Sequence, residues 1–380
     1  MRILISPQGF KGTLSGQSAA NAIAEGARRV FPDSYLDLVP IADGGHGSLE
    51  VLAHPLGASI RKSKVIGPYG KLVFANWGVS QDKKTAVLEM AEASGLVHAK
   101  KKHLDPWTAT TFGTGQLIRK ALDLGCNKIL IGLGGSATMD AGAGALQALK
   151  AMLTGKEGNQ ISYGPRGLLD LEHVDISQLP ESVLQAEILL ITDVNNPLCG
   201  KNGASAIYGP QKGALEKDIS LFDKALNNFA QVLEKDLGIQ VNGIPGMGAA
   251  GGLAAGMSVI GAKITWGAKM ICDLLKIDDH IRKADLVITG EGRIDKQTLF
   301  NKAPLEIAAR SVALKTPCLG IGGSIENGIE EFNQYGFFEL ESTIKNTDPV
   351  PNFEDSYQKL VDASERICYK ALNGGYLIIK

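Results

Sequence analysis

Lysines and carboxylates stand beside glycine turns at several places along this chain of 380 residues. The first place is Lys11, followed by Gly12 and Thr13, between an expected strand at residues 2–6 and an expected helix capped by Ser15. Helix starts carry a partial positive charge and N–H groups that hold anionic oxygens. The segment therefore predicts a phosphate-binding turn. An ordinary turn with a solvated lysine is the alternative.

Asp193 is a second candidate, because it follows an apolar run at residues 188–191 and precedes Asn196. A carboxylate at the end of a strand can hold Mg²⁺ or polarise a hydroxyl group. Together with a phosphate-binding turn, such a carboxylate suits phosphoryl transfer. An Asx turn ahead of Pro197 is the alternative interpretation.

The segment Gly290-Glu291-Gly292-Arg293-Ile294-Asp295 also follows an apolar run, and it holds two carboxylates and a guanidinium group. A structural ion pair usually spreads its charges over helix faces, whereas glycines here let the backbone approach a ligand. Glu291, Arg293 and Asp295 are therefore candidate site residues.

Two further glycine turns carry a charged residue. Lys212 lies in Gly209-Pro210-Gln211-Lys212-Gly213-Ala214, ahead of an expected long helix, and Asp43-Gly44-Gly45 follows an expected strand at residues 35–40. His46 stands at the start of the next expected helix, where a lone histidine is more typical of a solvated or capping residue. His46 is therefore left out of the catalytic candidates.

Two other nucleotide-binding patterns were compared with the chain. The segment Gly132-Leu133-Gly134-Gly135-Ser136-Ala137 matches G-x-G-x-x-A after an expected strand at residues 128–131, and we expect it to open a helix. Residues 154–164 are polar and glycine-rich, however, where a dinucleotide fold needs a second strand ending in an acid, so a dehydrogenase is disfavoured. No G-x-x-x-x-G-K-[ST] is present, which excludes a P-loop kinase.

Composition narrows the range of partners. The chain has 39 basic and 40 acidic residues, and only 6% of its residues are aromatic. A balanced charge gives no cationic field for nucleic acid or an anionic membrane, and few aromatic residues are available to stack on bases. We expect a small-molecule substrate, no nucleic acid and no membrane partner, and the sequence leaves a homo-oligomer open.

The five cysteines are widely spread and include no C-x-x-C pair, which favours a reducing compartment. The apolar start of the chain reaches Pro7 too early for a signal peptide, and no apolar run is long enough to span a membrane. We therefore expect a cytoplasmic protein.

Strands and helices alternate near both ends of the chain, whereas residues 59–90 have the pattern of an antiparallel meander. This predicts an α/β protein with a discontinuous doubly wound domain at residues 1–60 and 283–380. The middle, residues 61–282, is expected to form an inserted second α/β domain with a mixed sheet. We expect the active site in the cleft between the two domains.

Nine segments, in order, resemble the glycerate kinase family nearly end to end. They are Phe10-Lys11-Gly12-Thr13-Leu14-Ser15, Ala42-Asp43-Gly44-Gly45, Glu89-Met90-Ala91-Glu92-Ala93-Ser94-Gly95-Leu96, Thr110-Thr111-Phe112-Gly113-Thr114-Gly115, Gly134-Gly135-Ser136-Ala137-Thr138, Thr192-Asp193-Val194 with Asn196-Pro197-Leu198, Gly209-Pro210-Gln211-Lys212-Gly213-Ala214, Ala249-Ala250-Gly251-Gly252-Leu253, and Thr289 through Asp295 with Gln297-Thr298. The resemblance implies a flavodoxin-like first domain, a second α/β domain, and ATP- and Mg²⁺-dependent phosphorylation of D-glycerate to 2-phosphoglycerate.

The candidate residues follow from the motifs and the resemblance together. The catalytic candidates are Lys11, Asp193 and Asp295, and the metal candidates are Asp193 and Glu291. The substrate- and phosphate-binding candidates are Gly12, Thr13, Asp43, Gly44, Gly134, Gly135, Ser136, Asn196, Lys212, Glu291 and Arg293.

The chain departs from the family pattern beside several of these loops. The departures are Gln8-Gly9 in place of Asp-Ser, His46 in place of Glu, Met139 in place of Asn, and Asn301 in place of Gly. A kinase for a different small hydroxy acid and a non-catalytic two-domain binding protein are the alternatives to a glycerate kinase.

Overall fold

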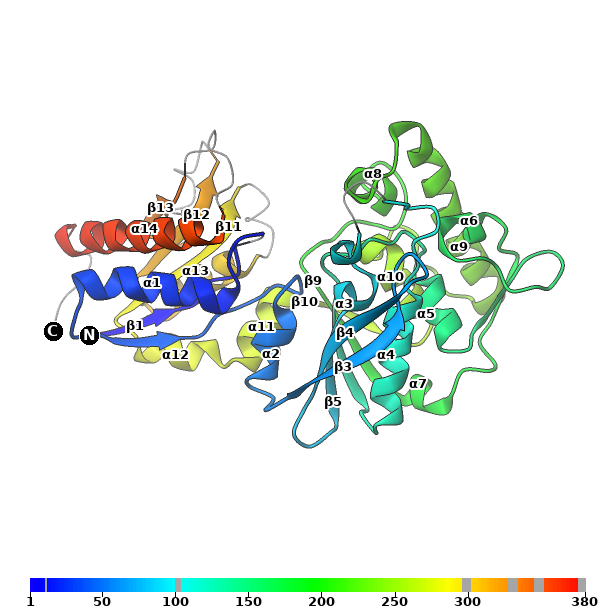
Figure 1. The fold of residues 1–380 in the computed structure, drawn as a ribbon, viewed down its shortest axis with the longest axis horizontal. Coiled ribbons are helices and arrows are strands. Elements are labelled where there is room, and N and C mark those ends of the chain that lie inside the picture. Colours follow the sequence, from blue (N-terminus) through cyan, green and yellow to red (C-terminus); the bar gives the residue numbers. More distant parts are fainter. Residues whose placement is uncertain (11, 100–103, 296–301, 327–333, 345–351, 375–380) are drawn as a thin grey trace. The chain divides into compact units, whose positions relative to one another are not determined.

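The computed structural model describes residues 1–10, 12–99, 104–295, 302–326, 334–344 and 352–374, drawn as a ribbon in Figure 1. The chain forms two compact units. The terminal unit comprises Met1–Asp43, Glu50–Pro55 and Trp266–Lys380, and the inserted unit comprises Gly44–Leu49 and Leu56–Thr265. This division assigns residues 266–282 to the terminal unit, whereas the sequence-based boundary near residue 283 assigns them to the insert.

The sheet of the terminal unit has the strand order β13-β12-β11-β1-β2, and its described strands pair in parallel. Its strands are β1 (Arg2–Ile5), β2 (Tyr35–Leu38), β11 (Leu286–Ile294), β12 (Cys318–Ile325) and β13 (Glu339–Ser342). Counted along the chain within this unit, the order is 2-1-3-4-5, which is the flavodoxin-like order. The expected doubly wound domain is confirmed.

Alternating side chains of β1 enter two separate cores. Ile3 and Ile5 pack with α1 and α14 on one face, and Leu4 packs with α11, α12 and α13 on the other. The helices of this unit are α1 (Gly16–Val30), α11 (Gly267–Leu274), α12 (Ile277–Lys283), α13 (Ala303–Ala313) and α14 (Phe353–Asn373). A parallel strand buried on both faces explains why the segment is apolar throughout.

Two of the described helices in this unit, α1 and α14, begin with a side-chain cap. Ser15 Oγ accepts a hydrogen bond of 3.1 Å from the N–H of Ser18 at the start of α1. Asn352 Oδ1 accepts one of 2.9 Å from the N–H of Asp355 at the start of α14. Each cap satisfies an N–H group that the helix itself leaves unpaired, so the cap expected at Ser15 is confirmed.

The inserted unit contains a mixed sheet with the strand order β10-β9-β6-β5-β4-β3. Its strands are β3 (Ser59–Ile66), β4 (Leu72–Val79), β5 (Thr85–Glu89), β6 (Lys128–Gly132), β9 (Glu187–Thr192) and β10 (Lys263–Trp266). The strands β3, β4 and β5 pair antiparallel, as expected from the meander, and β5, β6 and β9 pair parallel. A small hairpin of β7 (Met152–Thr154) and β8 (His173–Asp175) pairs separately.

Helices pack around this sheet, and most of them contribute to its main apolar core. They are α2 (Ser48–Ala53, which passes into the terminal unit), α3 (Met90–Ser94), α4 (Phe112–Asp123), α5 (Ala143–Ala148), α6 (Gly164–Leu169), α7 (Glu181–Gln185), α8 (Ala204–Tyr208), α9 (Ile219–Leu237) and α10 (Ala249–Ser258), with 3₁₀ turns η1 (Leu96–His98), η2 (Pro210–Lys212) and η3 (Glu216–Asp218). Among the described helices of both units, none has the length and apolar character needed to cross a bilayer.

The helix expected to open at residues 132–137 does not form there. The chain after β6 runs as an irregular loop, and α5 begins only at Ala143. Gly135 has φ +76° and Gly142 has φ +77°, and left-handed residues interrupt a right-handed helix. That expectation was wrong because the glycines serve the loop rather than a helix start.

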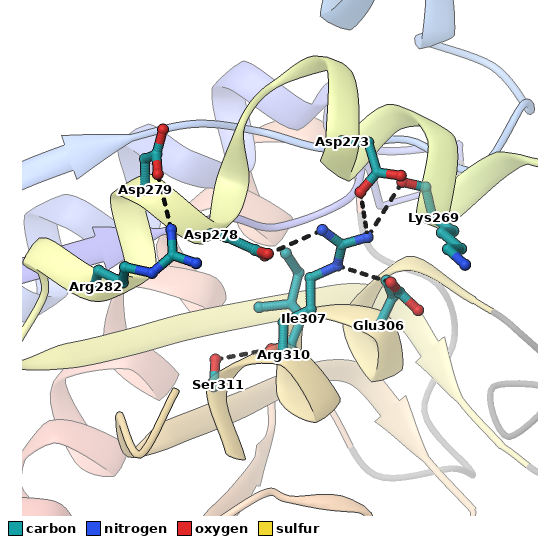
Figure 2. A network of polar contacts seen from close by, with 9 residues as sticks. All are labelled: Lys269, Asp273, Asp278, Asp279, Arg282, Glu306, Ile307, Arg310 and Ser311. Carbon is teal, nitrogen blue, oxygen red and sulfur yellow. Dashed lines mark hydrogen bonds and ion pairs between the residues drawn. The ribbon is translucent and has the colours of Figure 1, made fainter. Parts of the chain in front are cut away.

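One arginine joins three helices of the terminal unit, as Figure 2 shows. Arg310 on α13 donates to Glu306 at 2.7 Å, to Asp273 on α11 at 2.7 Å and to Asp278 on α12 at 3.0 Å. Its side chain is only 14% exposed. Because the guanidinium group balances three carboxylates at once, its loss would leave them to repel one another.

We predict that Arg310→Leu lowers the free energy of unfolding by roughly 1–2 kcal/mol, since it removes a mostly buried guanidinium group that bonds three partly exposed carboxylates. Arg282→Leu is the matched control, because Arg282 and its partner Asp279 are both exposed, and the substitution should change stability by less than about 0.5 kcal/mol. Urea unfolding followed by circular dichroism measures both. Equal effects of the two substitutions would show that the Arg310 network does not hold the helices.

Candidate active site

The carboxyl ends of β1 and β11 meet at one edge of the terminal sheet. The N–H of Ser6 donates to the carbonyl of Ile288 and that of Gln8 donates to the carbonyl of Gly290, each at 2.8 Å. The loop after β1 therefore lies against the strand that carries Glu291. This is the point at which the strand order reverses, where open α/β sheets bind their ligands.

Glu291 is 6% exposed, and its carboxylate lies 3.5 Å from Nζ of Lys302. Arg293 and Asp295 follow on the same strand end, with 3.2 Å between Nε and the carboxylate. Arg293 and Asp295 therefore form a pair, while Glu291, earlier on the same strand, pairs with Lys302. Lys302 is not among the candidates named from the sequence. Its position directly after Asn301, one of the departures from the family pattern, could have pointed to it.

The turn after β1 is held by its own backbone. The N–H and the hydroxyl of Thr13 both donate to the carbonyl of Phe10, at 2.9 and 3.0 Å. Thr13 thus uses in the turn the donors that were expected to hold phosphate. Gly12 has φ +84°, and Lys11 lies outside the described residues.

Gln8 contributes a polar atom with an unusual environment. Its Oε1 is buried and accepts no hydrogen bond in the part of the chain that the structure describes. A buried acceptor without a donor costs free energy unless a ligand or cation satisfies it. Gln8 therefore marks this edge as a place where a bound group can gain a contact.

A second edge lies in the inserted unit, at the carboxyl ends of β5, β6 and β9. The turn at Gly44 is seated on these strands, since its carbonyl accepts a 3.0 Å hydrogen bond from the N–H of Gly134. A Cβ atom at Gly44 would lie 2.4 Å from the carbonyl oxygen of Ile191. Only glycine permits this approach of the turn to the sheet.

Glu89, at the end of β5, fixes the start of helix α2. Its carboxylate accepts a 2.7 Å hydrogen bond from the N–H of Leu49 and lies 3.5 Å from Nδ1 of His46. Glu89 is 4% exposed, whereas the imidazole of His46 is 88% exposed. The exposure of His46 agrees with its exclusion from the catalytic candidates.

The loop after β6 holds the candidates Gly134, Gly135 and Ser136. It pairs with residues 94–96, because the N–H of Leu96 donates to the carbonyl of Gly135. Nζ of Lys212 donates to Oγ of Ser136 and to the carbonyl of Thr138, both at 2.7 Å. Lys212, the candidate in the glycine turn at residues 209–214, is only 1% exposed, since it lies beneath this loop.

Two buried charges support the same loop. Asp140 is fully buried and accepts hydrogen bonds from the N–H and the hydroxyl of Thr111 and from the N–H groups of Gly142 and Gly144. Burial raises the pKa of Asp140 and lowers the pKa of Lys212 to about 7, while the charge of Asp140 opposes the second shift. Asp140 was missed as a site residue.

The loop after β9 carries Asp193 and Asn196. Oδ1 of Asn196 accepts a 2.6 Å hydrogen bond from the hydroxyl of Tyr208, and its Nδ2 donates to the carbonyl of Asn202 at 2.9 Å. Burial and the nearby charge of Asp193 raise the pKa of Tyr208 to about 12, so the phenol remains a donor. Both ends of the Asn196 amide are used within the loop, and Asp193 is half-buried at the strand end.

The candidates thus divide between the two units. The terminal unit holds Gly12, Thr13, Asp43, Glu291, Arg293 and Asp295, and the inserted unit holds Gly44, Gly134, Gly135, Ser136, Asp193, Asn196 and Lys212. Among the departures from the family pattern, Met139 is fully buried against Phe222, and Asn301 lies outside the described residues.

Known proteins resemble this chain over nearly its whole length. Residues 3–372 match the model of the glycerate kinase family. Among curated relatives, the chain is 41% identical over 371 residues to the glycerate 2-kinase of Escherichia coli (strain K12), which covers 97% of each protein. It is 40% identical over 358 residues to the glycerate kinase of Halalkalibacterium halodurans, covering 93% of this chain and 94% of that protein.

A solved structure shares the fold. The crystal structure of a provisionally assigned glycerate kinase 2 from Salmonella typhimurium LT2 superposes with a TM-score of 0.82 at 37% identity, covering 98% of this chain and 99% of that one.

We predict that Gly44→Ala destabilises the protein by about 2 kcal/mol or more beyond the effect of Gly47→Ala. The two glycines have similar φ, +97° and +93°, so an alanine at either position has a similar free-energy cost for adopting the left-handed conformation. Only at Gly44 does the added Cβ meet the sheet, because nothing lies within 4 Å of it at Gly47. Thermal and urea unfolding compare the two variants, and similar losses would refute the seating of the turn.

A second prediction concerns the pH dependence of stability. Because the folded-state pKa of Lys212 is about 7 against an ordinary value of 10.5, the unfolded chain binds more protons between these values. The stability of the wild type relative to Lys212→Met should therefore rise with pH, by about 2 kcal/mol from pH 7.5 to pH 9. Urea unfolding at both pH values measures the difference. A constant difference would mean that Lys212 stays charged in the folded protein throughout this range.

Proposed function

The chain belongs to the glycerate kinase family, and we propose that it transfers the γ-phosphoryl group of ATP to the 2-hydroxyl of D-glycerate, with Mg²⁺, in the cytoplasm. Its relatives are named glycerate 2-kinase or glycerate kinase, which supports ATP-dependent phosphorylation of glycerate by this chain. The observation that carries this function is the nearly end-to-end family match, which includes every candidate loop of both units. The choice of hydroxyl rests on the relative named glycerate 2-kinase.

The residues present suit Mg²⁺ in the manner usual for kinases. Among the described residues, no group of three or more His, Cys, Asp or Glu side chains could hold a metal by itself. Kinases commonly bind Mg²⁺ through one or two carboxylates together with substrate phosphates, so a protein cage is not needed. Bound with ATP, Mg²⁺ would neutralise charge on the phosphate oxygens.

We assign the metal contacts to Glu291, which lies within β11, and to Asp193, which directly follows β9. Support at Glu291 comes from the buried Oε1 of Gln8 at the same edge, which has no donor in the described chain and is a hard oxygen that suits Mg²⁺. Lys302 stands 3.5 Å from the Glu291 carboxylate and offers a cation to phosphate oxygens. Lys11, Asp193 and Asp295 are assigned to catalysis, Lys11 by holding phosphate oxygens, and Arg293 is assigned to phosphate binding.

Asp193 is the residue assigned to the acceptor hydroxyl. A carboxylate can orient that hydroxyl and accept its proton as the oxygen attacks phosphorus. Tyr208 and Asn196 hold the loop around it, with their hydroxyl and amide groups bonded to each other at 2.6 Å. The loop therefore positions the carboxylate at the end of β9 without help from a ligand.

We predict that Asp193→Asn lowers kcat for D-glycerate by roughly 100-fold or more, because it keeps the side-chain shape and removes the charge. An ATP-consumption assay with Mg²⁺ measures kcat, and phosphorus NMR identifies the product. Asp223→Asn is a control in the same unit, since Asp223 accepts from Gly200 and Ser205 and has no assigned catalytic role.

The melting temperature distinguishes a catalytic role of Asp193 from a purely structural role in forming the turn. We expect Asp193→Asn to melt within a few degrees of the wild type. Near-normal kcat with a melting temperature lowered by many degrees would show that Asp193 forms a turn, and the catalytic carboxylate would then be sought at Asp43 or Asp295. A screen of short hydroxy acids in which D-glycerate is not the best substrate would overturn the proposed acceptor.

A further inference from the structure

Ser136 receives a hydrogen bond from a buried ammonium group. Nζ of Lys212 lies 2.7 Å from Oγ of Ser136 and donates to it, because a protonated lysine has donors and no acceptor. The Ser136 oxygen is therefore the acceptor in this contact, and its own proton must point elsewhere. In the described chain, no protein acceptor takes that proton.

The same loop offers further donors. The bridge between Gly95 and Ser136 uses the N–H groups of Leu96 and Ala137, and the N–H of Gly134 donates to Gly44. Within the described residues, the N–H groups of Gly135 and Ser136 donate to no protein acceptor. Gly135 is exposed and Ser136 is 7% exposed, so the loop can be reached by a ligand.

We infer that Lys212 is a positioning residue that polarises Ser136, so that the Ser136 hydroxyl and the adjacent N–H groups bind an oxyanion of a substrate. The oxyanion is either the carboxylate of the hydroxy acid or a phosphate oxygen of ATP, which share this chemistry. The inference rests on the proposed kinase function and adds to it the group that recognises negative charge in the inserted unit.

The physical reason is the burial of the lysine. An ammonium group that is 1% exposed gains little from water, and its field acts through a medium of low dielectric constant. A hydroxyl whose oxygen accepts from such a cation becomes a stronger donor, and hydrogen bonds to charged groups are the strong ones. Lys212 itself need not contact the ligand. It lies beneath the loop and strengthens the Ser136 hydroxyl as a hydrogen-bond donor to the anion.

Ligand binding should consequently take up a proton. Asp140 is the charged group that acts on Lys212 among the described residues, and burial holds the pKa of Lys212 near 7 without a ligand. An anion at Ser136 favours the charged form of Lys212 and raises this pKa. Affinity for the anion should therefore fall as the pH rises from 7 to 9, and this slope should be absent in Lys212→Met.

The test measures binding by isothermal titration calorimetry with three probes, D-glycerate, MgATP and inorganic phosphate. We expect Ser136→Ala to weaken one class of probe by about 10- to 100-fold, the scale of a hydrogen bond to a charged group. Selective loss of D-glycerate binding assigns the carboxylate, and loss of MgATP and phosphate binding assigns a phosphate oxygen. Lys212→Met should weaken the binding of the same probe. The double variant should bind that probe only slightly more weakly than either single variant does.

Lys217→Met is the matched control, because Lys217 is an exposed lysine in the next turn of the same unit. If Ser136→Ala binds all three probes as Lys217→Met does, the inference is overturned. It is also overturned if Lys212→Met weakens every probe equally with a lowered melting temperature, since that is a structural effect. Should Lys212→Met fail to fold, Ser136→Ala and the pH slope of the wild type still decide.

Failure of the proposed function has a different signature. In that case the wild type would consume no ATP in response to D-glycerate, whereas the binding measurements need no turnover. Loss of phosphate binding in Ser136→Ala would then still support the oxyanion site. Unchanged binding in a fully active Ser136→Ala enzyme would overturn the site and leave the kinase assignment intact.

Discussion

The parallel pairing of β1 with β11 is the constraint on which the terminal unit depends. Strands separated by nearly the whole inserted unit are joined by backbone bonds such as that from Ser6 to Ile288, and the hydroxyl of Thr289 donates to the carbonyl of Ser6 at 2.7 Å. The pairing completes the flavodoxin-like order and sets the Glu291 strand end against the turn after β1. Because the partner strand arrives late in the chain, the middle of the sequence must leave this unit and fold as an insert.

In the inserted unit, the loops at the carboxyl ends of β5, β6 and β9 are held in a different way. Close backbone approach and buried charged groups fix their positions. Gly44 brings a turn onto β6 and β9 at a distance that no other residue permits. Lys212 and Asp140 then support the loop after β6 from below, with their polar groups satisfied by Ser136, Thr138 and four donors around Asp140. Burying such charges costs free energy, and their hydrogen bonds offset the cost only if the loop keeps this shape.

The departures from the family pattern have unequal physical consequences. Gln8 places a buried oxygen without a donor at the edge of the terminal sheet, so it changes what a ligand meets there. Met139 packs in an apolar cluster with Phe222 and Ala214, so it changes the packing beneath a loop. His46 is largely exposed beside Glu89 and alters only the charge near the start of α2. The departure at Gln8 is therefore the one that bears most directly on ligand binding.

The sequence by itself determined the elements whose signals are local. The cap at Ser15, the apolar run of β11 and the position of Asp193 directly after β9 were all readable, because each depends on neighbouring residues. The strand β11 continues to Ile294, so Glu291 lies within it rather than after it. Only the tertiary structure decided that α5 starts late, that Lys212 is buried under Ser136, and that Tyr208 and Asn202 occupy both ends of Asn196. These outcomes depend on partners that are not neighbours in sequence and on the exclusion of water. A local sequence pattern contains no information on either.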